Sequence, residues 1–307
     1  MDDQRLRILR ELGELGSARA VAEALHITPS AVSQQLRLLQ RSVPVPLTQR
    51  VGRTLALTDA GRELASAAIE IERARAHARD VAAQLSREPA GTVTVSAFSS
   101  AALTFFGPLA ETFGPESKVH VELTDEDVAQ DRFPALTATY DIVVAHRLEH
   151  TPAWPSSVRT VPLLREPQDV ALPANHPLAT GQALTPTDVA GETWIATHAG
   201  FPPGAILDAI AAVAGRPIRI AHRVNEFTVA AELVRAGAGL ALIPRWTTPA
   251  PEGVVLRPLA GVVSARRIDA LLRPEKATRP ATRTVTDRLR DLAREISRKV
   301  PPSPSRA

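Results

Sequence analysis

A stretch of the chain without acidic residues carries the side chains best suited to chemistry with a polyanion. No aspartate or glutamate occurs between Glu23 and Asp59, whereas four arginines lie in that interval. Guanidinium groups pair with phosphate oxygens or guanine, and small hydroxyl and amide side chains reach base edges. The candidate DNA-binding residues are Thr28, Pro29, Ser30, Ser33, Gln34, Arg37, Arg41, Arg50 and Arg53. This segment therefore predicts a positive surface that binds double-stranded DNA.

Two short helices joined by a turn would present these side chains. Thr28 suits the cap of the second helix, and Pro29 suits its first position, where a missing N–H costs nothing. This helix is expected to extend to about Arg41. Its apolar residues Val32, Leu36 and Leu39 share one face, so its polar residues face outwards, towards a DNA groove.

A tight turn and a short strand follow the second helix. Arg50 and Arg53 flank Gly52, and the run at 54–57 alternates apolar and other residues. This pattern is typical of a β-wing, with its arginines beside the DNA backbone.

The sequence LHITPSAVS at residues 25–33 resembles the helix-turn-helix of the LysR-type transcriptional regulators. The resemblance implies a winged helix-turn-helix DNA-binding domain over residues 1–58. This chain has Pro29 where the family usually has glutamine, which affects a common DNA contact. It also has VPVPLT at 43–48 in place of the usual leucine-glycine and proline-leucine-phenylalanine, so the wing is supported differently. An amphipathic helical pair without a role in DNA binding is the alternative interpretation.

A long amphipathic helix is expected over residues 59–88. Small and apolar residues recur along it at alternating steps of four and three, which forms a heptad seam. They are Ala60, Leu64, Ala67, Ile71, Ala74, Ala78, Val81 and Leu85. Such a seam needs a partner, either the helix's own domain or a second copy. The family resemblance implies a homodimer, which suits a pseudo-palindromic promoter site, and the pairing of dimers into a tetramer.

The rest of the chain predicts an α/β effector domain. After a break at 87–91, strand patterns alternate with helical ones, which favours α/β units with mainly parallel sheets. Crossings near Arg165 and Arg267 suggest two subdomains with a cleft between them, as in periplasmic binding proteins. The expected boundaries are 92–165 with 268–300 for subdomain I, 166–267 for subdomain II, and a disordered tail at 301–307. The segments 162–178, 188–191 and 233–244 also resemble the LysR-type effector domain.

Ligands of open α/β sheets bind beyond the carboxyl ends of strands, near helix N-termini. The candidate effector-binding residues at such positions are Ser99, Ser100, His146, Arg147, Thr197, His198, Phe227 and Thr228. Their hydroxyl groups and the Arg147 cation suit a small acid or an amino acid. The acidic residues at 125–127 either bind an amino group of the ligand or form a solvated helix start. For each residue alone, an ordinary cap or an exposed loop is the alternative.

Motifs typical of enzymes are weak in this chain. Residues 146–150 spell H-x-x-E-H, a zinc-peptidase pattern, but that motif needs a helix and here it follows a strand. Gly237 and Gly239 precede a strand and lack the context of a phosphate loop. We therefore expect no catalytic residue, no metal site and no cofactor.

The composition favours a bacterial regulator in the cytoplasm. The 307 residues include no cysteine, which excludes disulfides and a cysteine redox sensor. The first residues lack the apolar core of a signal peptide, and no apolar run approaches a membrane span. The predicted function is sequence-specific transcriptional regulation, with DNA binding modulated by a small-molecule effector. The alternative is a solute-binding module whose helix-turn-helix serves protein contacts.

Overall fold

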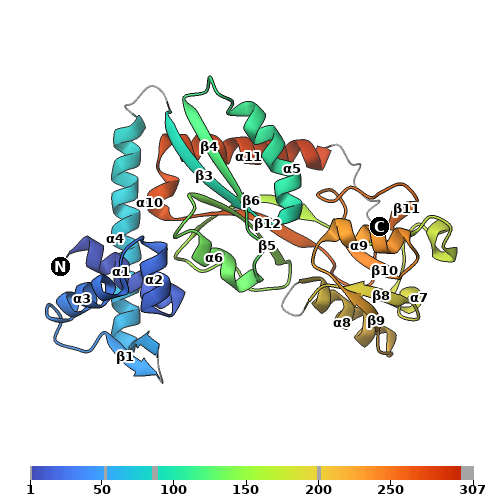
Figure 1. Ribbon diagram of the computed structural model, residues 1–307, viewed down its shortest axis with the longest axis horizontal. Coiled ribbons are helices and arrows are strands. Elements are labelled where there is room, and N and C mark those ends of the chain that lie inside the picture. Colours follow the sequence, from blue (N-terminus) through green and yellow to red (C-terminus); the bar gives the residue numbers. More distant parts are fainter. Residues whose placement is uncertain (1, 52–53, 85–88, 199–201, 299–307) are drawn as a thin grey trace.

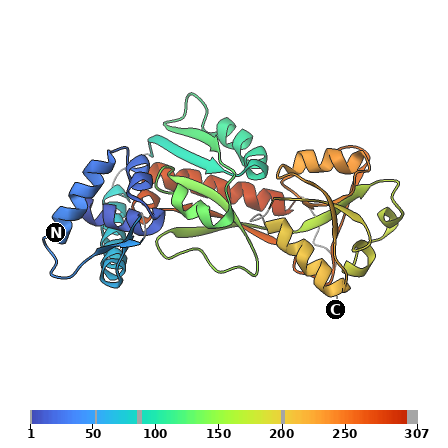
Figure 2. The same ribbon diagram turned by 60° about the horizontal axis from the view of Figure 1, so that its bottom comes forward.

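The computed structural model, described for residues 2–51, 54–84, 89–198 and 202–298, has three parts along the chain (Figure 1). A helical N-terminal domain carries a small hairpin, and one long helix leads from it to two α/β subdomains. Subdomain I lies next to the long helix, and subdomain II lies farther from the N-terminal domain (Figures 1 and 2). The molecule is therefore elongated, with the helix-turn-helix at one end.

The N-terminal domain contains three helices and a hairpin. They are α1 (Asp3–Leu15), α2 (Ala18–Ala24), α3 (Pro29–Gln40), β1 (Thr48–Val51) and β2 (Thr54–Leu57). The predicted cap of α3 is confirmed, because the Thr28 side chain accepts the Ala31 N–H, and Ser17 caps α2 in the same way. Apolar residues from all three helices, among them Leu9, Val21 and Leu36, form one core.

Helix α4 (Asp59–Gln84) follows the hairpin directly. Its Ala65 and Ala68 are buried in the N-terminal core. Gly61 is required in the first turn, because a Cβ there would overlap the carbonyl oxygen of Leu47. In the described ranges, no helix is both long and apolar enough to cross a membrane.

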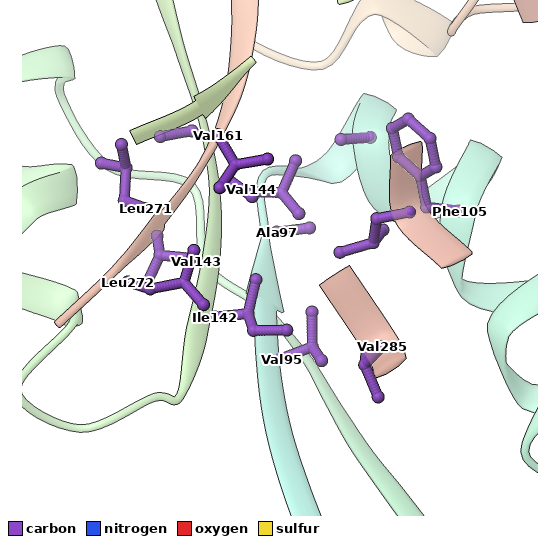
Figure 3. Close-up of a cluster of buried hydrophobic side chains, with 14 of the residues drawn as sticks. Val95, Ala97, Phe105, Ile142, Val143, Val144, Val161, Leu271, Leu272 and Val285 are labelled. Carbon is purple, nitrogen blue, oxygen red and sulfur yellow. The ribbon is translucent and has the colours of Figure 1, made fainter. Parts of the chain in front are cut away.

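Subdomain I holds a five-stranded sheet in the order β4-β3-β5-β12-β6. Its strands are β3 (Gly91–Ala97), β4 (Val119–Asp125), β5 (Ile142–Leu148), β6 (Arg159–Glu166) and β12 (Arg266–Leu272). Its helices are α5 (Ser99–Thr112), η1 (Gln130–Arg132), α6 (Phe133–Leu136), α10 (Pro274–Ala277) and α11 (Pro280–Arg298). Val95 and Ile142 of the sheet share a buried cluster with Phe105 of α5 and Val285 of α11 (Figure 3).

Subdomain II holds a second five-stranded sheet in the order β11-β7-β10-β8-β9. Its strands are β7 (Gln168–Pro173), β8 (Thr193–Ala196), β9 (Arg219–Arg223), β10 (Leu240–Pro244) and β11 (Val254–Arg257). Its helices are η2 (Pro177–Thr180), α7 (Pro186–Val189), α8 (Pro202–Ala214) and α9 (Phe227–Arg235). Trp194 fills the core, where its indole N–H donates to the Val189 carbonyl at 3.1 Å.

The expectation of mainly parallel sheets is wrong, because both sheets are mixed. Strand β12 runs antiparallel to β5 and β6, and β7 runs antiparallel to β10 and β11. The chain leaves subdomain I through β6 and returns through β12, so these crossover strands enter one sheet in opposite directions. Hydrophobic periodicity reports burial and carries no information about strand direction.

Candidate DNA-binding face and effector pocket

Helix α3 separates an apolar face from a polar face, as its sequence predicts. Val32, Leu36 and Leu39 are buried in the N-terminal core. The predicted DNA-binding residues are all exposed where they are described: Thr28, Pro29, Ser30, Ser33, Gln34, Arg37, Arg41 and Arg50. Arg53, the ninth, lies outside the described residues. The face of α3 opposite the core is therefore free to contact a partner.

The arginines of this face have no acidic neighbour. Within the described ranges, Arg37, Arg41 and Arg50 form no salt bridge, whereas Arg19 on α2 pairs with Glu23 at 3.0 Å. The hydroxyl groups at the start of α3 are held in place, since the oxygens of Thr28 and Ser30 lie 2.9 Å apart. Fixed hydroxyls beside unpaired guanidinium groups suit contacts to phosphates and base edges.

Gln40 supports the segment that departs from the family pattern. Its amide nitrogen donates to the Val45 carbonyl at 2.8 Å, and its amide oxygen accepts from the Leu47 N–H at 2.8 Å. Thr58 donates to the Pro46 carbonyl at 2.6 Å from the other side. These bonds fix the chain between α3 and the wing without the usual glycine and phenylalanine.

The predicted seam of α4 is covered by its own domain only near its start, where Leu64 packs against the N-terminal core. Ala67, Ala74 and Ala78 are exposed, and Ile71 is 42% exposed. The side chains of Val81 and Leu85, also predicted in the seam, lie outside the described part. The neighbouring face, with Ala65 and Ala68, is the one that packs inwards. Helix α4 therefore has one apolar face buried in the chain and a second facing solvent.

A buried ion-pair network, not foreseen from the sequence, joins the N-terminal domain to subdomain I. Arg10 of α1 pairs with Glu11 at 2.9 Å, with Glu275 of α10 at 3.3 Å and with Glu72 of α4. Arg273, which precedes α10, pairs with Glu11. Both arginine side chains are only 1% exposed. The network thus holds α1, α4 and α10 together.

A pocket lies between the two subdomains. Subdomain I contributes Phe98, Ser99, Ser100, Asp127, His146 and Arg266. Subdomain II contributes Gln168, Thr197, Pro203, Asn225, Glu226 and Phe227. Several of these residues directly follow β3, β8 or β9, at the strand ends where ligands of α/β sheets bind.

A fully buried salt bridge forms one wall of this pocket. Arg266 and Glu166 face each other on the two crossover strands, and their side chains lie 2.8 Å apart. The Arg266 guanidinium also donates to the hydroxyls of Ser100 at 2.9 Å and Thr247 at 2.7 Å. The ring centres of Phe98 and Phe227 lie 4.9 Å and 5.6 Å from it. The pair thus links the crossover strands with groups from both subdomains.

Both halves of the chain match models of one protein family. The model described as "Bacterial regulatory helix-turn-helix protein, lysR family" matches residues 4–62. The model described as "LysR substrate binding domain" matches residues 86–294, more than half of the chain. The chain belongs to the LysR family. It is a DNA-binding transcriptional regulator with an effector-binding domain, which confirms the main functional prediction rather than the solute-binding alternative.

Individual relatives agree with the match to the LysR family. The HTH-type transcriptional regulator TtuA of Agrobacterium vitis is 30% identical over 284 residues, covering 88% of this chain and 92% of TtuA. Full-length OxyR from Pseudomonas aeruginosa has a similar fold, with a TM-score of 0.61 and 18% identity. The match covers 96% of this chain and 95% of the OxyR chain. CbnR, solved in complex with its target DNA, has a TM-score of 0.50 and 20% identity. The match covers 96% of this chain and 100% of the CbnR chain. The predicted fold class is confirmed by these matches.

The pocket of this regulator gathers some of the effector residues predicted from the sequence and not others. Those that line it are Ser99, Ser100, His146, Thr197 and Phe227. Arg147 points elsewhere, to the Thr151 carbonyl at 3.1 Å and to Asp269 at 3.6 Å. Successive side chains of a strand point to opposite faces, so His146 and Arg147 cannot both line it. His198 and Thr228 are exposed and lie outside its lining.

The H-x-x-E-H segment of the regulator does not form a helix. His146 lies on β5, and its ring packs against the edges of Phe98 and Phe133, with ring centres 4.5 Å and 5.2 Å away. Burial lowers the pKa of His146 well below its ordinary value, and Arg266 adds to this effect. The imidazole is therefore neutral at pH 7.

Proposed function

We propose that this regulator binds a pseudo-palindromic promoter site as a homodimer, and that dimers pair into a tetramer. The exposed face of α3 enters the major groove and the wing lies beside the backbone. A small molecule in the pocket between the subdomains modulates this binding. The protein acts in the cytoplasm, with no role at a membrane and no catalytic, metal or cofactor chemistry.

The observation that carries this proposal is the exposed polar face of α3. Its hydroxyls are fixed by the helix cap, and Arg37 and Arg41 have no acidic partner among the described residues. Guanidinium groups without an acidic partner are available to phosphate oxygens and base edges. The solved CbnR complex with target DNA supports this use of the fold.

The exposed seam of α4 supports the homodimer. A stripe of alanines around Ile71 permits close approach of a second helix. The same stripe has no cover among the described residues of this chain. A two-fold axis through this seam would also place two copies of α3 on two half-sites.

Replacement of Arg37 by alanine is expected to weaken DNA binding without affecting the fold, because the side chain is exposed. If Arg37 contacts a phosphate, its loss reduces the slope of log affinity against log salt concentration by about one. If it contacts a base, its loss weakens discrimination between the correct and a wrong base by about 1–3 kcal/mol. Gel-shift titrations at several salt concentrations, with the DNA upstream of the chain's own gene, measure both quantities.

Arg290→Ala is the matched control for this measurement. The Arg290 side chain is 40% exposed, but it lies on α11 and pairs with Asp287 at 3.3 Å. Binding by this variant should equal that of the wild type. If Arg37→Ala binds with the same affinity and salt slope as Arg290→Ala, α3 does not dock through this face.

A further inference from the structure

Two carboxylates from different subdomains meet at the pocket between them. Asp127 follows β4 of subdomain I, and Glu226 precedes α9 of subdomain II. Partial desolvation raises the pKa of Asp127 to about 6, Glu226 adds to the rise, and Arg266 opposes it. Neither carboxylate forms a salt bridge within the described ranges. Two like charges thus line the same pocket, and neither has a cation as a direct partner among the described residues.

The Arg266 guanidinium in the pocket wall is not a direct ion-pair partner of Asp127 or Glu226. Arg266 donates to Glu166 through two of its nitrogens, at 2.8 Å and 3.0 Å. Glu166 is fully buried, so this bridge is screened little by water. The site therefore holds one guanidinium, that of Arg266, and the three carboxylates of Glu166, Asp127 and Glu226. The pocket therefore carries excess negative charge.

Helix N-termini at the pocket would ordinarily attract an anionic ligand. Helices α5 and α9 both begin here without a side-chain cap. Glu226 occupies the N-cap position of α9, and its carboxylate accepts from the Ser99 hydroxyl, in the first turn of α5, at 2.9 Å. The protein's own carboxylate thus lies at both helix starts, which satisfies their preference for negative charge.

Neutral polar atoms line the inner part of the pocket. His146, Gln168 and Thr197 are 95% buried or more. Their His146 Nδ1, Thr197 Oγ1 and both Gln168 amide atoms have no hydrogen-bond partner among the described residues. Buried polar atoms are almost always paired, so these atoms are suited to hydrogen bonds with a ligand. They offer neutral hydrogen bonds and no positive charge, since His146 is neutral.

We propose that the effector is a small primary amine without an acidic group, with its ammonium between Asp127 and Glu226. Its hydroxyl, carbonyl or second amino group would meet Gln168 and Thr197. This inference rests on the proposed effector role of the pocket. An ammonium bonded to both carboxylates removes their repulsion and draws the two subdomains together. Binding then favours the closed arrangement by its differential affinity for it.

Calorimetry with the full-length protein tests the charge class through matched pairs of probes. Ethanolamine is compared with glycolate, and putrescine with succinate, at millimolar concentrations. We expect each amine to bind at least about tenfold more tightly than its carboxylate counterpart. Asp127→Asn and Glu226→Gln, which keep the side-chain shape, should each weaken amine binding about tenfold or more. Gln168→Met should weaken the binding of any ligand in the pocket, whatever the charge of that ligand.

The dependence on pH gives a second readout. Protonation of Asp127 below about pH 6 removes one carboxylate, so amine affinity should fall from about pH 7.5 to about pH 5.5. The charged groups that face Asp127 are Glu226 and Arg266, and His146 remains neutral. Asp127→Asn should lose this dependence on pH.

The outcomes separate the amine inference from the proposed function. Tighter binding of the carboxylates, or no binding of either amine, overturns the amine inference. If the carboxylate probes bind and Gln168→Met weakens their binding, the pocket remains the effector site and only the proposed class of ligand is wrong. Binding that none of the three variants alters would place the ligand elsewhere and overturn the proposed effector site as well.

Discussion

Replacement of Arg273 by methionine should lower the free energy of unfolding by about 3–5 kcal/mol, the usual effect of removing one partner of a buried ion pair. The Arg273 side chain is 1% exposed and pairs with Glu11, which is fully buried, and with Glu14 at 3.2 Å. Without it, Glu11 would keep only Arg10 as a direct ion-pair partner among the described residues. The N-terminal domain should then separate more readily from subdomain I.

Hydrogen exchange resolves this effect by region, which matters because a chain of several domains need not unfold in one step. Amides of α1 should lose protection in Arg273→Met, whereas those of the subdomain II sheet should keep it. Arg294→Met is the control, since Arg294 is 67% exposed and its pair with Asp291 should contribute about 0–1 kcal/mol. Adding Glu11→Gln to Arg273→Met should recover part of the loss, because it removes a buried carboxylate that has lost one of its two arginine partners. Equal exchange in Arg273→Met and Arg294→Met would show that the network does not hold the domains together.

Local signals explain why the exposed polar face of α3 is predictable from the sequence. A helix cap, a proline at the first helical position and a spacing of apolar residues act within about one turn of each other. Thr28 and Val32 therefore define the start and the buried face of α3 without knowledge of the rest of the fold. The position of Arg50 on a wing strand follows in the same way.

The lining of the pocket between the subdomains is only partly predictable, because it depends on pairing between distant strands. Strand β5 is buried along most of its length, so its sequence does not show whether His146 or Arg147 faces the ligand. Arg266 and Glu166 come together only because β12 returns beside β6, 100 residues later in the chain. The contact of Arg273 with Glu11 spans 262 residues and likewise has no local signal. Buried charges of this kind are placed by topology, which sequence periodicity does not encode.

Replacement of Ile71 by aspartate should convert the proposed homodimer into monomers. Ile71 is 42% exposed in the single chain, so an aspartate there is solvated and the chain should still fold. In the dimer the same carboxylate would be buried against alanines of a second copy, and the guanidinium one turn along, that of Arg75, already pairs with Asp3. Burying an unpaired charge costs about 3–5 kcal/mol, which raises the dissociation constant on the order of a hundredfold or more. The two-fold symmetry of the interface applies this penalty to both copies.

Analytical ultracentrifugation over a range of concentrations measures this change, and Ser66→Asp provides the matched control. Ser66 is an exposed residue of the same helix, five positions before Ile71 and well away from the seam around the helix axis. An aspartate at Ser66 should leave the dimer intact. Ile71→Asp should also lose cooperative binding to a promoter with two half-sites while it retains weak binding to one half-site, because each α3 still folds. A dimer of unchanged stability in Ile71→Asp would exclude this seam as the interface and would require the two copies of α3 to be held together by another surface of the chain.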